Sequence, residues 1–246
     1  MKVIAVIPAR FASTRFPGKP LALIGGKPMV IHVVERTLST QNINQVVVAT
    51  DHPEILNTVK HFGFEAIMTS DSHESGTDRC AEVLHKLDQE FDVVLNIQGD
   101  EPFIEKASLD QLVSCFDNSD CEIATLYHKI SDPSQIDNPS SVKLVKTNDG
   151  KALYFSRSPI PFSRENSAEK TTNYYKHIGL YGFKADVLKA VTKLPVSTLE
   201  QTEKLEQLRW LENGFSIYVA EANNSPIAVD TPNDLKKAQE YFNSQG

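Results

Sequence analysis

The sequence predicts an α/β fold in which an antiparallel insertion completes a mostly parallel sheet. Two observations predict it. Apolar runs of strand length alternate with helical segments over the first half of the chain, and signals typical of antiparallel strands replace that alternation after about residue 120. Alternating strands and helices are typical of a parallel sheet with helices on both faces. The 246 residues are enough for one large domain of this kind or for two small ones.

Four apolar runs predict the parallel half of the sheet. They span residues 3–7, 46–50, 65–67 and 93–97. Helices are expected at about 53–61 and 77–87, and Gly25-Gly26-Lys27-Pro28 is expected to open the first helix of the chain. Because strand and helix signals alternate, these strands are expected to run parallel to one another.

Further strand signals follow in the second half. They lie at 122–127, 142–146, 152–156 and 217–219. The second and third of these runs flank Asp149-Gly150, a pair of residues that favours a hairpin turn. This part of the chain is therefore expected to be antiparallel.

Two helices are expected near the end of the chain. Ser197 and Glu200 have the spacing of a capping box, which predicts a single helix from there to Gly214. A terminal helix is expected over 231–242, with Pro232 at its first position. The predicted organisation is one domain over 1–246, divided into a parallel part (1–120), an antiparallel insertion (121–185) and a C-terminal return (186–246).

Composition excludes several classes of protein. The net charge is −7, so the surface as a whole does not attract nucleic acid. The three cysteines have no CxxC spacing, which argues against a zinc site and against a disulfide framework. The chain contains neither a secretory signal pattern nor an apolar stretch of membrane-spanning length, so a soluble cytoplasmic protein with no membrane partner is expected.

A basic loop, residues 10–19, follows the first predicted strand. It carries Arg10, Arg15 and Lys19 together with Ser13 and few residues that could form a core. Ligands of α/β sheets bind at the carboxyl ends of strands, where a loop of this charge could hold a polyphosphate with Lys19 on a β- or γ-phosphate. The loop matches neither the GxxxxGK[ST] nor the GxGxxG pattern. A solvated surface turn is the alternative, and a nucleotide-using enzyme is the first hypothesis.

Two carboxylates are candidate metal ligands. Asp100 follows a predicted buried strand in Gln98-Gly99-Asp100, so it is expected at the sheet edge that also carries the basic loop. Asp230 ends another apolar run, and it fits the N-cap of the terminal helix equally well. Magnesium is usually held by one or two carboxylates together with substrate phosphates. The sequence does not show whether Asp100 and Asp230 meet.

The segment Ser75-Gly76-Thr77-Asp78-Arg79 has two interpretations. Its Ser, Thr and Asp are typical capping residues at a helix start. A loop of small residues could also let a flat nucleotide base approach the backbone, where the hydroxyls and Asp78 would contact its polar edge.

The second half holds further candidates with plain alternatives. Arg157 ends a predicted strand and could be a surface charge or a bidentate partner for a substrate carboxylate. His177 alternates with apolar residues and is more simply a hydrogen-bonded histidine on a strand face. Glu206 and Gln207 adjoin the apolar stripe of the predicted helix, where an edge position is expected. No Ser-His-Asp or Cys-His arrangement is supported by the spacing.

Motifs along the whole chain resemble those of one family, the bacterial 3-deoxy-manno-octulosonate (Kdo) cytidylyltransferases. The matching segments are residues 7–10, 15–21, 49–51, 75–79, 96–102, 152–157, 176–179, 205–209 and 229–232. The basic loop and the Gln-Gly-Asp motif at 98–100 recur in related nucleotidyltransferases, whereas Tyr-Phe-Ser-Arg at 154–157 and Leu-Glu-Gln-Leu-Arg at 205–209 point to this family more narrowly. The resemblance implies a Rossmann-like sheet of the nucleotidyltransferase (GT-A-like) type, with the insertion forming the contact of a homodimer.

The resemblance also implies an activity and a set of site residues. Members transfer CMP from CTP to the anomeric hydroxyl of Kdo, releasing pyrophosphate and activating the sugar for lipopolysaccharide biosynthesis, with Mg²⁺ as the cofactor. By analogy, the residues expected to contact CTP are Arg10, Ser13, Lys19, Ser75, Thr77, Asp78, Arg79 and Gln98, with Arg10, Lys19 and Asp100 taking part in catalysis. The expected metal ligands are Asp100 and Asp230, and the expected sugar-binding residues are Gln98, Arg157, His177, Tyr181, Glu206 and Gln207.

Two alternatives remain open at this point. The sugar could be another acidic sugar, such as 8-amino-Kdo or a sialic acid. The chain could also be a non-catalytic nucleotide-binding module, although Lys19, Asp100 and Asp230 together argue for catalysis because simple binding does not need two metal carboxylates.

Overall fold

The chain divides into two units in the computed structural model, which describes residues 1–12, 16–164, 172–224 and 227–245. Unit 1 comprises Met1–Asp110 and Pro226–Gly246, and unit 2 comprises Gln111–Ser225. The chain therefore leaves unit 1 after α4 begins (Lys106–Ser114) and returns to it for the terminal helix α8 (Pro232–Ser244). Among the described residues, no helix combines the length and the apolar character needed to cross a membrane.

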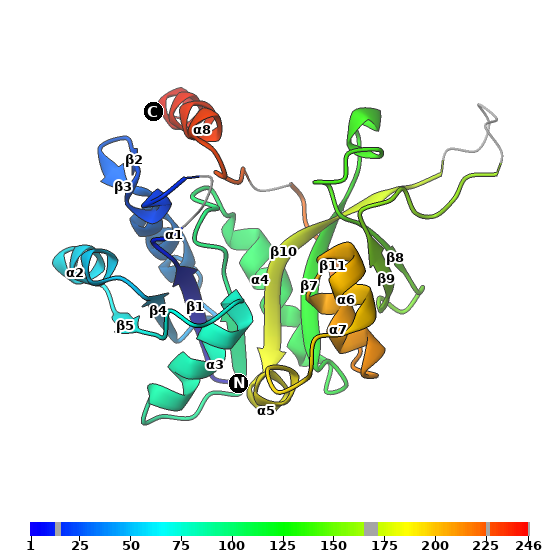
Figure 1. Ribbon diagram of the computed structural model, residues 1–246, viewed down its shortest axis with the longest axis horizontal. Coiled ribbons are helices and arrows are strands. Elements are labelled where there is room, and N and C mark those ends of the chain that lie inside the picture. Colours follow the sequence, from blue (N-terminus) through cyan, green and yellow to red (C-terminus); the bar gives the residue numbers. More distant parts are fainter. Residues whose placement is uncertain (13–15, 165–171, 225–226, 246) are drawn as a thin grey trace. The chain divides into compact units, whose positions relative to one another are not determined.

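Unit 1 is built on a parallel sheet (Figure 1). Its strands are β1 (Val3–Ala9), β4 (Gln45–Thr50), β5 (Ala66–Met68) and β6 (Val93–Asn96), in the spatial order β6-β1-β4-β5. The helices packed on them are α1 (Met29–Leu38), α2 (Pro53–His61) and α3 (Gly76–Lys86). Because β6 pairs with the side of β1 opposite β4, the strand order reverses between β1 and β6, which is where ligands bind in sheets of this type.

The core explains why these segments are strands. Six of the seven residues of β1 are buried, since the strand has neighbours on both edges and is covered on both faces. The registers Val6↔Val47 and Val6↔Asn96 align the carboxyl ends of β1, β4 and β6. The predicted parallel arrangement is thus confirmed.

A short hairpin and the C-terminal helix lie side by side although they are far apart in the sequence. The hairpin consists of β2 (Leu23–Ile24) and β3 (Lys27–Pro28), with Gly25 and Gly26 at positive φ in its turn, and it follows a 3₁₀ turn, η1 (Lys19–Leu21). Figure 1 shows α8 against this hairpin, where Gly25 N–H donates to Gln239 Oε1 at 3.0 Å. Ile24, Met29, Phe103, Val229 and Ala238 form the buried cluster between them.

Unit 2 is antiparallel apart from its last strand. Its strands are β7 (Ile123–Lys129), β8 (Lys143–Lys146), β9 (Ala152–Ser156), β10 (Tyr175–Lys184) and β11 (Ile217–Glu221). Strand β10 pairs antiparallel with β7 and β8, β8 forms the predicted hairpin with β9, and β11 joins β7 in parallel. The remaining elements are α5 (Ala185–Val191), α6 (Thr198–Glu203), α7 (Gln207–Glu212), η2 (Cys115–Asp117) and η3 (Pro133–Gln135).

The prediction of one helix from about 197 to 214 is wrong. Ser197 and Glu200 do form the predicted capping box, but the segment is divided into α6 and α7. Lys204 adopts the left-handed conformation, with φ 54°, which ends α6. The apolar spacing that suggested one helix arises from the buried residues of α7 and from Leu205 in the connection.

Candidate active site

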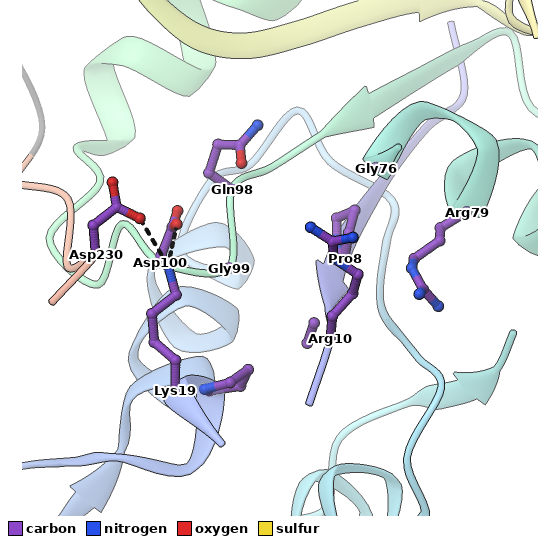
Figure 2. Close-up of a pocket in the computed structure, with 11 residues that line it drawn as sticks. Pro8, Arg10, Lys19, Gly76, Arg79, Gln98, Gly99, Asp100 and Asp230 are labelled. Atoms are coloured by element: carbon purple, nitrogen blue, oxygen red, sulfur yellow. Dashed lines mark hydrogen bonds and ion pairs between the residues drawn. The ribbon is translucent and has the colours of Figure 1, made fainter. Parts of the chain in front are cut away.

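A cavity of about 240 Å³ lies in unit 1 where the strand order reverses. Its walls come from the carboxyl ends of β1 and β6, the first turn of α3, η1 and the segment before α8, and the lining residues are Pro8, Ala9, Arg10, Lys19, Pro20, Gly76, Arg79, Gln98, Gly99, Asp100 and Asp230. Figure 2 draws these residues as sticks. Predicted site residues from four distant parts of the sequence therefore share one cavity.

The two candidate metal carboxylates meet at one ammonium group. Lys19 Nζ lies 2.6 Å from Asp100 Oδ2 and 3.2 Å from Asp230 Oδ1, as the dashed lines of Figure 2 mark. The Lys19 side chain is 13% exposed, whereas the Asp100 and Asp230 side chains are 26% and 43% exposed. The basic side chain is thus sheltered and the carboxylates remain open to the cavity.

Local backbone contacts bring Asp230 to Asp100. Val229 N–H donates to the Asp100 carbonyl at 2.9 Å, and the Val229 side chain is buried in the cluster beneath α8. The alternative interpretation of Asp230 as the helix N-cap is wrong, because Thr231 caps α8 in a capping box with Asp234. Asp230 therefore lines the cavity and does not cap α8.

Gly99 allows β1 and the segment after β6 to approach closely. A Cβ atom at this position would lie 2.6 Å from the Pro8 carbonyl oxygen, which belongs to the backbone and cannot rotate away. Any other residue would push Gln98 and Asp100 away from the end of β1. The sequence motif Gln-Gly-Asp thus has a steric reason as well as a chemical one.

The first turn of α3 combines capping with access to the cavity. Ser75 is the N-cap of α3 and accepts from Asp78 N–H at 3.1 Å, while its hydroxyl donates to Asp78 Oδ2 at 2.8 Å. The capping interpretation is therefore confirmed for Ser75, whose hydroxyl Asp78 Oδ2 holds in place, and Thr77 is buried in the core. Gly76 lines the cavity, and a Cβ there would lie 3.3 Å from Asn96 and Pro8. A role of these residues in base binding stays a prediction.

The remaining nucleotide-site predictions have mixed outcomes. Arg10 is exposed and lines the cavity, and Gln98 also lines it. Ser13 lies outside the described residues. Arg79 reaches the cavity wall, but its guanidinium is fully buried and bound to Asp51, Thr69 and Ser70. It thus joins protein segments in addition to any contact with a ligand.

In unit 2, His177 and Tyr181 lie together on β10. Their ring centroids are 5.3 Å apart, and Phe155 and Trp210 pack at 5.1 Å from His177 and 5.0 Å from Tyr181 respectively. The Tyr181 hydroxyl is buried without a hydrogen-bond partner among the described residues, and the same holds for Gln207 Nε2 and Trp210 Nε1. Burial and the nearby Glu206 raise the pKa of Tyr181 well above its ordinary value, so the phenol stays neutral. Buried polar groups of this kind need a hydrogen-bond partner, which ordered water or a polar ligand can supply.

Glu206 and Gln207 lie where the chain enters α7. Glu206 is the N-cap residue, and Gln207 is the first residue of the helix. The expected edge position is wrong for Gln207, which is only 5% exposed. Because α6 ends at Lys204, α7 is a separate helix with its own buried face, which the pattern of an undivided helix did not predict.

Arg157 is more than a surface charge. Its guanidinium donates to three backbone carbonyls, those of Glu203 at 2.7 Å, Pro139 at 2.9 Å and Lys204 at 3.2 Å. An arginine has five N–H donors, so two of them have no partner within the described part of the chain. Its predicted contact with a substrate carboxylate stays a prediction.

A buried lysine beside Arg157 was missed from the sequence. Lys143 is fully buried on β8 and donates to the carbonyls of Asn138, Ser141 and Arg157 at 2.9, 2.6 and 2.6 Å. Burial lowers its pKa, and Asp137 and Glu203 oppose that change. The run Lys143-Leu144-Val145-Lys146 has a lysine at each end and gave no sign that Lys143 would be buried.

We expect His177 to remain neutral through the physiological pH range. Its Nε2 lies 3.0 Å from Thr125 Oγ1, whose single proton goes to a carbonyl of Ile178 or Leu180, so Nε2 donates. Burial lowers the pKa of His177 to about 3. NMR resonances of this ring, assigned with the His177→Gln variant, should not titrate between pH 5 and 8.

The lowered pKa of His177 also predicts how the stability of the fold changes with pH. An unfolded histidine takes up its proton near pH 6.5, whereas the folded one does so near 3. The contribution of His177 to stability is therefore present above pH 6.5 and decreases as the pH falls from 6.5 toward 3. A ring resonance with a midpoint near 6.5 would contradict this account of the site.

A comparison with known protein families identifies the class of protein to which this chain belongs. Residues 4–221 match the sequence model of a family described as cytidylyltransferase. Together with the cavity at the reversal of strand order, this match defines a nucleotidyltransferase.

Close relatives then give the particular family. Two proteins named 3-deoxy-manno-octulosonate cytidylyltransferase, from Phocaeicola vulgatus and Porphyromonas gingivalis, are each 49% identical to this chain; the alignments cover 98% and 100% of this chain and 98% of each relative. A solved structure of CMP:2-keto-3-deoxy-manno-octonic acid synthetase complexed with CTP is 44% identical, with a TM-score of 0.95 over 100% of both chains. The chain belongs to the family of 3-deoxy-manno-octulosonate cytidylyltransferases.

Proposed function

We propose that this protein transfers CMP from CTP to the anomeric hydroxyl of Kdo. The new bond joins the anomeric oxygen to the α-phosphorus, the bond between the α- and β-phosphates breaks, and pyrophosphate leaves. The product is CMP-Kdo, the activated form in which the sugar enters lipopolysaccharide biosynthesis. The similarity to relatives with this printed name, over nearly their whole length, supports the choice of substrates.

One observation carries the proposal: Asp100 and Asp230 converge on Lys19 in a cavity that Arg10 also lines. This arrangement suits a triphosphate whose charge must be neutralised while its leaving group departs. Phosphoryl-type transfer needs positioning and charge neutralisation more than a covalent protein intermediate. The absence of a nucleophile pattern in the sequence agrees with that chemistry.

We also propose Mg²⁺ as the cofactor, held by Asp100 and Asp230. The two side chains fit such an ion, because both offer carboxylate oxygens and both approach the same cationic nitrogen. The described residues contain no group of three or more acidic, histidine or cysteine side chains that could hold a metal, which agrees with an ion completed by substrate phosphates and water. When bound, it would polarise the α-phosphate and lower the pKa of the attacking hydroxyl.

The side chains of this chain act on charge and position. Lys19 and Arg10 stabilise the negative charge that grows on the departing pyrophosphate. Gln98, at the carboxyl end of β6, is suited to orient the substrates through its amide. Gly99 holds this segment close to β1, so the donors do not have to move during the reaction.

The sugar is proposed to bind unit 2. His177, Tyr181, Glu206 and Gln207 offer hydrogen-bonding groups suited to its hydroxyls. Tyr181 Oη and Gln207 Nε2, which have no hydrogen-bond partner among the residues that the structure describes, support this assignment. Two N–H donors of Arg157 have no partner among the described residues and are suited to the sugar carboxylate.

We propose that two copies of the chain associate through unit 2, as a cytoplasmic homodimer. Leu153 on β9 and Phe162 after it are 59% and 88% exposed, which is unusual for large apolar side chains and supports a protein contact. The free thiols Cys80, Cys115 and Cys121 agree with a reducing compartment. Sedimentation equilibrium of the wild type and of Phe162→Ser should show a dimer that the substitution weakens; a wild-type monomer would refute the assignment.

The function is tested by pyrophosphate release from CTP and a panel of acidic sugars with Mg²⁺. We expect release with Kdo and loss of activity when EDTA removes the metal. The values of kcat/KM for 8-amino-Kdo and for a sialic acid should be lower than that for Kdo.

Each other outcome has a separate meaning. Faster release with another acidic sugar would replace Kdo as the substrate and keep the reaction. No release with any sugar, in a protein that still binds CTP, would support the non-catalytic module instead.

A further inference from the structure

Asp51 does not line the cavity, but its side chain bonds to two parts of unit 1 that do. It follows β4, and its side chain is 11% exposed. Oδ1 accepts from Phe11 N–H at 3.2 Å, and Oδ2 accepts from Arg79 Nη2 at 2.7 Å. One carboxylate thus contacts the basic loop on one side and helix α3 on the other.

Phe11 holds the two ends of the basic loop close together. Its carbonyl accepts from Gly18 N–H at 3.0 Å, which brings the two ends of the segment between them together. Its ring stacks on His52, with centroids 3.9 Å apart and planes at 17°. The position of Phe11 therefore fixes Arg10, which precedes it, and Lys19, which follows Gly18.

Arg79 anchors the first turn of α3 to the segment that follows β5. Its guanidinium is fully buried, and Nη1 donates to Thr69 Oγ1 at 2.8 Å and to the Ser70 carbonyl at 3.0 Å. These contacts hold the segment after β5 against α3, whose first turn presents Gly76 to the cavity. A buried guanidinium needs a counter-charge, and the ion pair with Asp51 supplies it.

We propose that Asp51 is a positioning residue that fixes the two described ends of the basic loop, at Phe11 and Gly18, relative to the first turn of α3. The proposal rests on the assignment of CTP as the ligand of this cavity. A triphosphate held by the loop and a base held near α3 bind as one ligand only when the two segments keep a set separation. The Asp51 carboxylate maintains that separation, because it bonds to both segments at once.

The test compares CTP with its two fragments, cytidine and pyrophosphate, by calorimetry on the full-length protein. In Asp51→Asn, the amide oxygen still accepts from Phe11 N–H, but Arg79 loses its counter-charge. We expect the Kd of CTP to rise at least tenfold and those of cytidine and pyrophosphate to change less than threefold, because each fragment needs only one segment. Asp88→Asn removes the same charge from an exposed position in unit 1 and should leave all three values unchanged.

A second variant covers the case in which Asp51→Asn does not fold. Asp51→Glu keeps the counter-charge of Arg79 and both acceptor oxygens but places them one methylene farther from the backbone, so it alters the separation of the two segments without leaving a buried charge unpaired. It should show the same selective loss of CTP affinity.

Three outcomes would overturn the proposal or its basis. A folded variant that binds CTP within twofold of wild type shows that Asp51 does not position the segments. Equal weakening of CTP, cytidine and pyrophosphate shows a general structural role instead. Failure of the wild-type protein to bind CTP refutes the proposed function itself, before any variant is compared.

Discussion

Asp100→Asn is expected to lower the Mg²⁺-dependent rate of pyrophosphate release by about 10²–10³-fold, the range found when a group that stabilises charge in the transition state is removed. The carboxylate lies at the cavity edge, where it accepts from Lys19 Nζ at 2.6 Å. The amide keeps the size of the side chain but offers a much weaker metal ligand. The variant should still fold, because the substitution keeps the Asp100 backbone carbonyl, which accepts the hydrogen bond from Val229 N–H.

The measurement is a Mg²⁺ titration of the initial rate for wild type and variant, with thermal unfolding as the check on folding. Asp88→Asn is the matched control, since it makes the same change of charge at an exposed position. The midpoint of the titration should move to higher Mg²⁺ in Asp100→Asn. A rate near that of wild type would refute the metal assignment, and a slow rate with an unchanged midpoint would show that Asp100 acts by orienting Lys19.

The position of Asp100 in the cavity could be predicted from the sequence more directly than that of Asp230, and the reason is physical. Asp100 follows a strand, and the rule that parallel strands present their carboxyl ends at one edge places it beside the basic loop. Asp230 depends on a bond between Val229 N–H and the Asp100 carbonyl and on the burial of Val229 beneath α8. Those contacts join positions 129 residues apart along the chain (229 minus 100), and neither propensity nor periodicity carries such information.

Side chains whose partners are backbone atoms were the hardest to predict. Arg157 and Lys143 bond mainly to backbone carbonyls. Because every residue has a backbone carbonyl, no pattern of side chains in the sequence predicts these contacts. The division of α6 from α7 has a similar cause, because a lysine at positive φ leaves no signal of the kind that glycine gives. The parallel strands were predictable because burial on both faces requires a continuous apolar run.

Lys143→Met is expected to destabilise unit 2 by about 3 kcal/mol, since each buried polar group left without a partner costs about 1–3 kcal/mol. The ammonium of Lys143 donates to the carbonyls of Asn138, Ser141 and Arg157, and methionine fills a similar space without any donor. Replacing a buried ion pair by apolar groups can be neutral when both partners are replaced, but backbone carbonyls cannot be replaced. The loss of the donor therefore dominates.

Urea unfolding followed by tryptophan fluorescence measures this directly, because the single tryptophan, Trp210, is buried in unit 2. Lys129→Met, on the exposed end of β7, is the control and should change the free energy of unfolding by less than about 0.5 kcal/mol. The variant should also raise the KM for the sugar, since the Arg157 carbonyl and the 138–141 segment lose a shared anchor. A loss of stability no larger than that of the control would mean that water replaces the ammonium at these carbonyls, and that Lys143 does not hold the segments around Arg157.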